Sequence, residues 1–441
     1  MYHNMTKGNI TKGLLLFALP MIAGNLLQQF YNIADTLIVG QVLGRDALAS
    51  VGSAYSLMTF LTSIFLGLSL GAGALFSMYF GEKDMDALRS AIVHAFLLIL
   101  CITLFLNLLV YLFLDPILVF LQIPSELYAA MREYLLIIFA GLAATFLYNF
   151  FACLLRAIGN SVTPLWFLGI SAFLNIGLDL LFVKVLPFGI AGAAAATVIA
   201  QYVSGIGLFL YVILKCRDLR PASFRWDKTI IREICSLSLM TCLQQSTMNF
   251  GILLVQRLVD SFGSVIMAAF AAGVKIDTFA YLPVQDFGNA FSTFVAQNYG
   301  AGETKRLRKG FQKAVLVSAG FSCVLSLLVC LFARPLMRIF IKAEETAVLA
   351  AGVRYLRIEG FFYMGIGCLF LLYGFYRAVN RPGMSVILTV ISLGLRVLLA
   401  YILSVAFAET GIWIAIPIGW AIADLTGFAY YFRLRKKGIL A

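Results

Sequence analysis

The stretch that decides the fold class is RSAIVHAFLLILCITLFLNLLVYLFL, residues 89–114. After Arg89, it holds no Asp, Glu, Lys or Arg through Leu114. An α-helix rises about 1.5 Å per residue, so about 20 apolar residues cross the hydrocarbon layer of a membrane. The stretch therefore predicts a membrane-spanning helix. Eleven further runs resemble it, and we expect twelve spanning segments in all: 13–42, 47–80, 89–114, 127–152, 161–186, 189–214, 231–260, 265–297, 309–333, 347–375, 383–408 and 411–432.

The composition of the whole chain supports this interpretation. Of its 441 residues, 62% are hydrophobic and 12% are charged, whereas soluble domains carry about 25% charged residues. This excess excludes a soluble enzyme, a disordered chain and a disulfide scaffold. A membrane β-barrel would alternate apolar and polar residues in strands of about 10, while the apolar runs here are continuous. We expect an all-α polytopic membrane protein with twelve transmembrane helices.

Residues that carry enzyme or cofactor chemistry are scarce. The eight cysteines include no Cys-x-x-Cys pair, and there are two histidines, so we expect no cofactor and no His-built metal site. No G-x-x-x-x-G-K-[ST] loop is present, so we expect no ATP hydrolysis by this chain. The stretch GLSLG at 67–71 matches a G-x-S-x-G nucleophile motif, but it lies inside an apolar helix and is more typical of a close helix-packing face. The protein is not expected to be an enzyme.

The Lys and Arg residues between the segments indicate the orientation. With the N-terminus in the cytoplasm, 22 of the 33 fall on the cytoplasmic side and nine outside, while Lys275 and Arg396 lie inside the membrane. Cytoplasmic loops are enriched in these residues, so we expect both termini in the cytoplasm. The net charge of +12 then indicates topology and contact with anionic membrane lipids rather than nucleic-acid binding.

The two halves of the chain repeat each other. The sequence LQQ at 27–29 recurs at 243–245, and RA at 156–157 recurs at 377–378. Six helices per repeat make the repeats parallel, and paired parallel repeats are typical of transporters that alternate access to a central cavity.

The repeat places the domain boundary in a basic linker. We expect two pseudo-symmetric six-helix bundles, an N-lobe of residues 1–217 and a C-lobe of residues 218–441. A monomer is sufficient for this design.

Four oxygen-bearing side chains of the first half are expected at one depth. Asp179 and Thr197 each lie nine residues from the outer turn at Phe188, Asp35 lies near the same level, and Asn175 precedes Asp179 by one helical turn. Carboxylate, amide and hydroxyl oxygens are ligands for hard cations, and two close carboxylates can share a proton. The set predicts a coupling-cation site for H⁺ or Na⁺. The alternative is structural: Asp35 caps a helix break and Asp179 pairs with a nearby donor.

The second half lacks this set, because Gly251 and Gly419 stand where the repeat has Asp35 and Thr197. It carries other polar residues inside its segments, which are expected either to contact a cationic substrate or to form salt bridges with one another: Asp277, Asp286, Arg396 and Asp424.

Three motifs together resemble the multidrug and toxic compound extrusion (MATE) family, over essentially the whole chain. These are YNIADTLIVG at 31–40, AQNYGAG at 296–302, and RAIGN at 156–160 followed by Thr163-Pro164. The resemblance implies a cation-coupled efflux antiporter. In prokaryotic members of the DinF-like branch it implies an N-lobe ion site of Asp, Asn, Asp and Thr, which corresponds here to Asp35, Asn175, Asp179 and Thr197.

The expected function is therefore export of organic cations or drugs in exchange for H⁺ or Na⁺ across a bacterial or archaeal inner membrane. Aromatic side chains that line a cavity would hold flat cations through cation–π contacts. The alternative is a flippase for lipid-linked oligosaccharides, which would need a basic cavity for pyrophosphate; Lys275 and Arg396 are the candidates for it.

Overall fold

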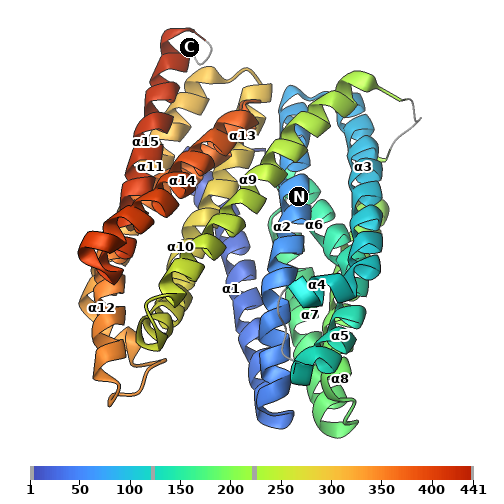
Figure 1. Cartoon of the computed structure of the whole chain (residues 1–441). Helices are drawn as coiled ribbons and strands as arrows, with labels where there is room; N and C mark the ends of the chain where they lie inside the picture. The colour runs from blue at the N-terminus through green and yellow to red at the C-terminus, as the bar shows by residue number, and fades with distance from the viewer. Residues whose placement is uncertain (1–3, 121–124, 221–225, 439–441) are drawn as a thin grey trace. The chain divides into compact units, whose positions relative to one another are not determined.

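The computed structural model describes residues 4–120, 125–220 and 226–438, and within these ranges the chain is helical without any β-strand (Figure 1). Each of the twelve predicted segments coincides with a long helix or a broken pair of helices. Long apolar runs form helices because a helix satisfies all of its backbone hydrogen bonds internally, which a membrane requires.

Ten of these helical segments are long and apolar enough to span a membrane, judged on the described residues. An eleventh is a pair of helices bent by 51° at Phe362. The twelfth predicted segment forms the 33-residue helix α9 (Lys228–Asp260), whose middle is made less apolar by Gln244, Gln245 and Asn249. The all-α membrane fold is thus as predicted, and the polar α9 is its least apolar long helix.

The chain forms two compact units, each described here by itself. Unit 1 contains residues 1–4 and 19–242, and unit 2 contains residues 5–18 and 243–441. The first helix of each half is therefore divided between the units. The lobe boundary at 217/218 stays a prediction.

Unit 1 holds most of helix α1 and the helices up to the first part of α9. Short irregular helices break its regular ones: η1 is a 3₁₀ turn, η2 is a π-helix and η3 is a 3₁₀ turn. The bounds are α1 (Ile10–Val42), α2 (Arg45–Glu82), α3 (Met85–Leu112), α4 (Leu114–Phe120), α5 (Ser125–Ile138), η1 (Phe139–Gly141), α6 (Leu142–Ala157), α7 (Val162–Asp179), η2 (Leu180–Val185), α8 (Gly189–Lys215) and η3 (Arg217–Leu219).

The packing of α2 against α9 depends on glycine. A Cβ atom at Gly71 would lie 2.5 Å from the Ser238 Cα, and one at Gly67 would lie 2.6 Å from the Cys242 Cα. Neither position has room for a side chain, so the G-x-x-x-G spacing of 67–71 is a helix-packing face, as predicted.

Unit 2 contains α10 (Ser264–Gly300), α11 (Thr304–Met337), α12 (Thr346–Phe361), α13 (Tyr363–Ala378), α14 (Pro382–Phe407) and α15 (Glu409–Lys436). Aromatic rings fill its interior; Phe311 stacks on Tyr431 with ring centroids 4.1 Å apart. Residues 5–18 belong to this unit, and the Arg306 guanidinium donates to the carbonyls of Met5, Lys7 and Gly8.

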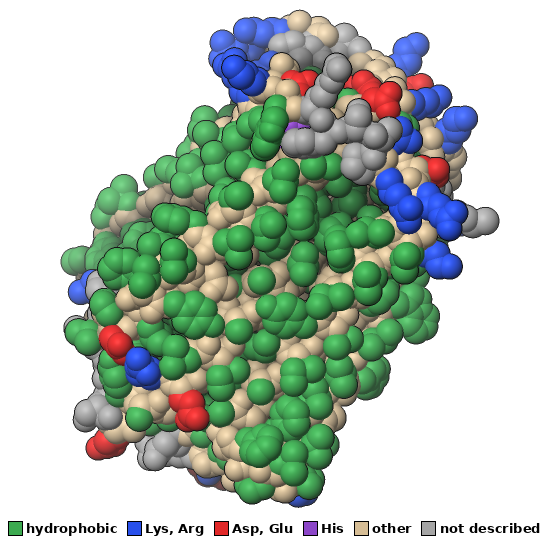
Figure 2. Space-filling model, turned by 90° about the vertical axis from the view of Figure 1, so that its right-hand side faces the viewer, with side chains coloured by type: hydrophobic (Ala, Val, Ile, Leu, Met, Phe, Trp, Pro, Cys, Tyr) green, Lys and Arg blue, Asp and Glu red, His purple; other side chains and the backbone are tan. Residues whose placement is uncertain are grey.

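The surface of the helices suits a membrane. On the face seen in Figure 2, hydrophobic side chains form a broad field and Lys and Arg side chains gather mainly toward one end. On α3, Leu104, Phe105 and Leu108 are each more than half exposed, as expected for side chains that contact lipid.

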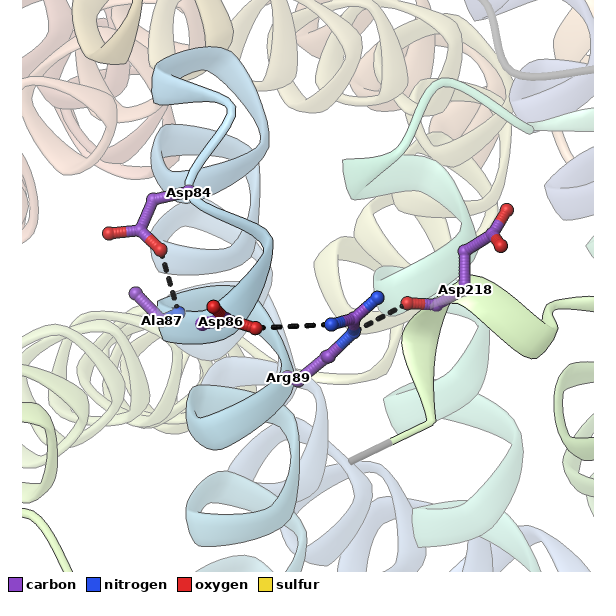
Figure 3. A network of polar contacts seen from close by, with 5 residues as sticks. All are labelled: Asp84, Asp86, Ala87, Arg89 and Asp218. Carbon is purple, nitrogen blue, oxygen red and sulfur yellow. Dashed lines mark hydrogen bonds and ion pairs between the residues drawn. The ribbon is translucent and has the colours of Figure 1, made fainter. Parts of the chain in front are cut away.

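A polar network closes the charged end of α3 (Figure 3). The Asp84 carboxylate accepts from the Ala87 N–H as an N-cap, and Asp86 pairs with Arg89 at 3.1 Å. Arg89 also donates to the Asp218 carbonyl in η3 at 2.7 Å. This contact ties the end of α8 to the beginning of α3 within unit 1.

Candidate ion-coupling site

Two of the predicted site residues lie in the last two turns of α7. Asn175 is 2% exposed and Asp179 is fully buried. Directly after Asp179, the chain continues as the π-helix η2. The wider turn of a π-helix often occurs at functional sites, and here it fixes the last residue of α7 between neighbouring helices.

Helix α8 lies beside α7 and completes one side of the site (Figure 1). The Asn175 amide Nδ2 donates to the Thr197 hydroxyl at 3.3 Å. Since the amide nitrogen points at Thr197, the amide oxygen of Asn175 is left to face other groups. The two helices thus present acceptor oxygens at one level.

Helix α1 supplies the fourth residue. α1 lies against α7 here, since a Cβ at Gly24 would be in ordinary van der Waals contact with Leu168 at 3.4 Å and one at Gly169 with Leu27 at 3.7 Å. One turn beyond Tyr31, the Asp35 carboxyl group interacts electrostatically with the Asp179 carboxyl group. The structure therefore brings Asp35, Asn175, Asp179 and Thr197 together inside unit 1.

The oxygens of this group lack donors. Asp35 Oδ1, Asn175 Oδ1 and both carboxylate oxygens of Asp179 are buried without a hydrogen-bond partner. Buried acceptors without donors are costly in a protein interior. Their convergence suits a cation or a shared proton, because either one supplies the positive charge that the surrounding side chains do not.

Tyr134 is a member of this group that the sequence does not reveal. It lies on α5, is 7% exposed, and interacts electrostatically with both Asp35 and Asp179. No motif marks it, because α5 reaches the site only through the tertiary fold.

In unit 2, the residues predicted from sequence lie on three different helices. Asp277 (4% exposed) on α10 accepts hydrogen bonds from the hydroxyls of Tyr355 and Tyr363. Glu359 on α12 interacts electrostatically with Asp277 and with Arg396 on α14. Tyr355 and Glu359 lie one turn apart on α12, and this spacing is a signal in the sequence for these two; Tyr363 begins α13 beyond the bend at Phe362, so no helical spacing marks it.

The remaining predicted residues of unit 2 do not join this cluster through any ion pair. Asp286 is buried on α10, and Asp424 is on α15, with its Oδ1 lacking a hydrogen-bond partner. No ion pair within 4.0 Å joins Arg396 to Asp277 or Asp424, all of which lie in the described part of the chain. Contact of these four residues with a substrate and pairing among them both stay predictions.

Two helical units with buried carboxylates inside membrane-spanning helices define a polytopic membrane protein of the transporter type. The MatE family profile matches residues 20–181 and 237–402, which is most of the chain, so this protein belongs to the MatE family of multidrug efflux transporters. It is a multi-pass membrane protein. Its assignment to the DinF-like branch stays a prediction.

The chain is similar to named relatives along almost its whole length. It is 29% identical to the probable multidrug resistance protein YpnP of Bacillus subtilis, over 99% of this chain and 98% of that protein. It is 25% identical to the probable multidrug resistance protein NorM of Thermotoga maritima, over 87% of this chain and 83% of that protein. These names do not favour the lipid-linked oligosaccharide flippase.

A solved structure shares the fold. An outward-facing multidrug resistance MATE transporter superposes with a TM-score of 0.92 at 22% identity, covering 98% of both chains.

Proposed function

We propose that this protein is a secondary active antiporter that exports organic cations or drugs in exchange for H⁺ or Na⁺ by alternating access. The observation that supports the proposal is the group of buried, donor-free oxygens of Asp35, Asn175 and Asp179 beside Thr197. The relatives' names, which are those of multidrug resistance proteins, support the substrate class.

The ion would act by changing the balance between conformations. Two carboxylates in contact repel each other when both are ionised, and a proton or a Na⁺ between them removes the repulsion. A ligand shifts a conformational equilibrium only by its difference in affinity for the two states. Coupling therefore requires that this pair come together in one state and separate, or become hydrated, in the other.

Several properties of the transporter belong to the same proposal. Its substrates are small molecules, it works in a bacterial or archaeal inner membrane with both termini in the cytoplasm, and one copy is sufficient. The protein needs no cofactor besides the coupling ion. It binds membrane lipids but no nucleic acid.

The experiment is ethidium transport in membrane vesicles under an imposed Na⁺ gradient or an imposed pH gradient. We compare the unmodified protein with Asp35→Asn and Asp179→Asn, and use Asp115→Asn as the matched control, because Asp115 is an exposed carboxylate of the same unit. Loss of gradient-dependent transport in the first two variants and not in the control, at equal protein levels, supports the proposal, and the effective gradient names the ion. Undiminished transport in both variants would contradict it.

A further inference from the structure

A basic cavity lies in unit 2, at the end of α15. It has a volume of about 310 Å³, within the range of ligand pockets. Its lining consists of Arg381, Tyr430, Arg433, Leu434 and Lys437. Three of these five side chains are cationic, and none is acidic.

The cavity wall is built from two elements that are far apart in sequence. Tyr430, Arg433 and Lys437 follow one another at intervals of three and four residues, so they share one face of the last two turns of α15. Arg381 comes from the turn between α13 and α14, and it donates to the Tyr430 hydroxyl at 3.2 Å. The Tyr430 ring also packs against Tyr376, with centroids 5.5 Å apart, which holds this wall in place.

No nearby sequence supplies a counter-charge. Neither the turn of residues 379–383 nor the helix end of residues 430–438 contains an Asp or Glu. Arg433 and Lys437 are exposed, and no ion pair is described for either one or for Arg381. Three cations around one concave space produce a local positive potential that attracts an anion.

The beginning of α14 adds a second feature. Arg381 occupies its N-cap position, Pro382 is the first residue of the helix, and the cap residue makes no side-chain hydrogen bond to the first turn. Space next to Gly383 is open, since a Cβ there would meet nothing within 4 Å. The positive end of the α14 dipole therefore begins next to Arg381 and adds to the positive potential beside the cavity, while the first turn of α14 does not line it.

We propose that this cavity binds a phosphate-bearing anion, held by the guanidinium groups of Arg381 and Arg433 and by the ammonium group of Lys437. Guanidinium groups bind phosphate oxygens through paired, charge-assisted hydrogen bonds, and a lysine adds a compact positive charge. The phosphate comes either from an anionic lipid headgroup or from a free phosphate compound, because both present the same oxygens. The site is separate from the oxygen cluster of unit 1 and does not depend on the proposed antiport.

The test measures binding to the full-length purified protein in a non-ionic detergent by titration calorimetry. The probes are short-chain phosphatidylglycerol, inorganic phosphate, and short-chain phosphatidylcholine, which carries a phosphate without net charge. The variants are Arg433→Gln/Lys437→Gln and the matched control Arg435→Gln/Lys436→Gln. Each pair removes two positive charges from the same helix end, but only the first pair lines the cavity.

We expect saturable binding of phosphatidylglycerol that weakens at least about tenfold in Arg433→Gln/Lys437→Gln and less than about twofold in the control, because charge-assisted hydrogen bonds are lost only in the first pair. Binding of phosphatidylglycerol alone identifies a lipid headgroup. Inorganic phosphate that binds and competes with it identifies a free phosphate compound as a ligand.

Two results would overturn the proposal. One is the absence of saturable binding of either anionic probe to the unmodified protein. The other is an equal loss of affinity in both double variants, which would mean diffuse attraction by net charge. If the first double variant does not fold, the single charge reversals Lys437→Glu and Lys436→Glu make the same comparison with one substitution each.

Discussion

Asp179 of unit 1 and Asp277 of unit 2 are both buried, but they differ in their hydrogen-bond donors. In unit 1, both oxygens of Asp179 and one of Asp35 lack any donor. In unit 2, Asp277 receives hydrogen bonds from two tyrosine hydroxyls, whereas Glu359 Oε2 and Asp424 Oδ1 lack a hydrogen-bond partner. A buried acceptor with donors is a structural element, whereas one without donors needs a ligand. The contrast is therefore between Asp179, which has no donor at either oxygen, and Asp277, which has two, and a bound ion is expected to stabilise Asp179 more than Asp277.

The largest expected effect is that of Asp179→Asn. The amide retains the size of the carboxylate but cannot take up a proton or neutralise Na⁺, so we expect gradient-driven ethidium transport to fall at least about tenfold, the lower end of what removing a buried charged group costs. Asp277→Asn is the counterpart in unit 2, where the new amide oxygen still accepts from a tyrosine. We expect Asp277→Asn to retain most transport. Equal losses in the two variants would break the distinction between the units.

A smaller effect is expected from Tyr355→Phe/Tyr363→Phe. This double variant removes both donors from Asp277 without changing ring packing, and Tyr355 keeps its edge contact with Trp413. We expect a loss of about 1–3 kcal/mol in stability, visible as a lower melting temperature of the detergent-solubilised protein, because a buried acceptor loses its partners. Unchanged melting would mean that the tyrosines do not support unit 2, and a complete loss of ion-dependent transport would assign Asp277 to coupling.

The sequence predicts the fold well because the membrane imposes one rule on every segment. Long apolar runs such as 89–114 must be helical, and the structure places helices there. Breaks are harder to predict: the bend of 51° at Phe362 and the π-helix after Asp179 follow from packing between helices. No local residue pattern distinguishes them from regular helix.

The candidate sites show the same limit. Helical rise alone placed Asp35, Asn175, Asp179 and Thr197 at one depth, and the structure brings them together. Tyr134 was missed because proximity across helices depends on how each helix rotates about its own axis.

The cluster around Asp277 was only half found. The sequence marks Asp277 but not its donors: Tyr355 lies on α12, and Tyr363 begins α13 beyond a bend that the sequence does not reveal. Tyrosines are common in this chain, and nothing in their identity separates a donor to a carboxylate from a core residue.

Thr197→Val is expected to have a modest effect on the group in unit 1. The substitution removes the hydroxyl that accepts from Asn175 at 3.3 Å, so the amide loses its orientation. One hydrogen bond of about 0.5–1.5 kcal/mol corresponds to a roughly 2- to 10-fold higher ion concentration for half-maximal transport, with the maximal rate preserved. Thr36→Val is the matched control, since the Thr36 hydroxyl bonds only its own helix at Asn32. A similar shift in both variants would remove Thr197 from the site.

The smallest effect is expected at Asp115 on α4, which lies outside the membrane-spanning helices and accepts a hydrogen bond from Arg132 at 2.8 Å. This hydrogen bond, with a second from Tyr128, lowers the pKa of Asp115 below its ordinary value. A lowered pKa in the folded state stabilises the protein above the unfolded-state pKa, and the contribution is lost as the pH falls through the folded-state value. Both side chains are about half exposed, so the pair is screened by solvent and its contribution is small.

Arg132→Gln should therefore lower the melting temperature slightly at pH 7, and the difference from the unmodified protein should vanish at a pH well below 4, where Asp115 is protonated. A difference that is equally large at both pH values would show that Arg132 contributes through packing rather than through its charge.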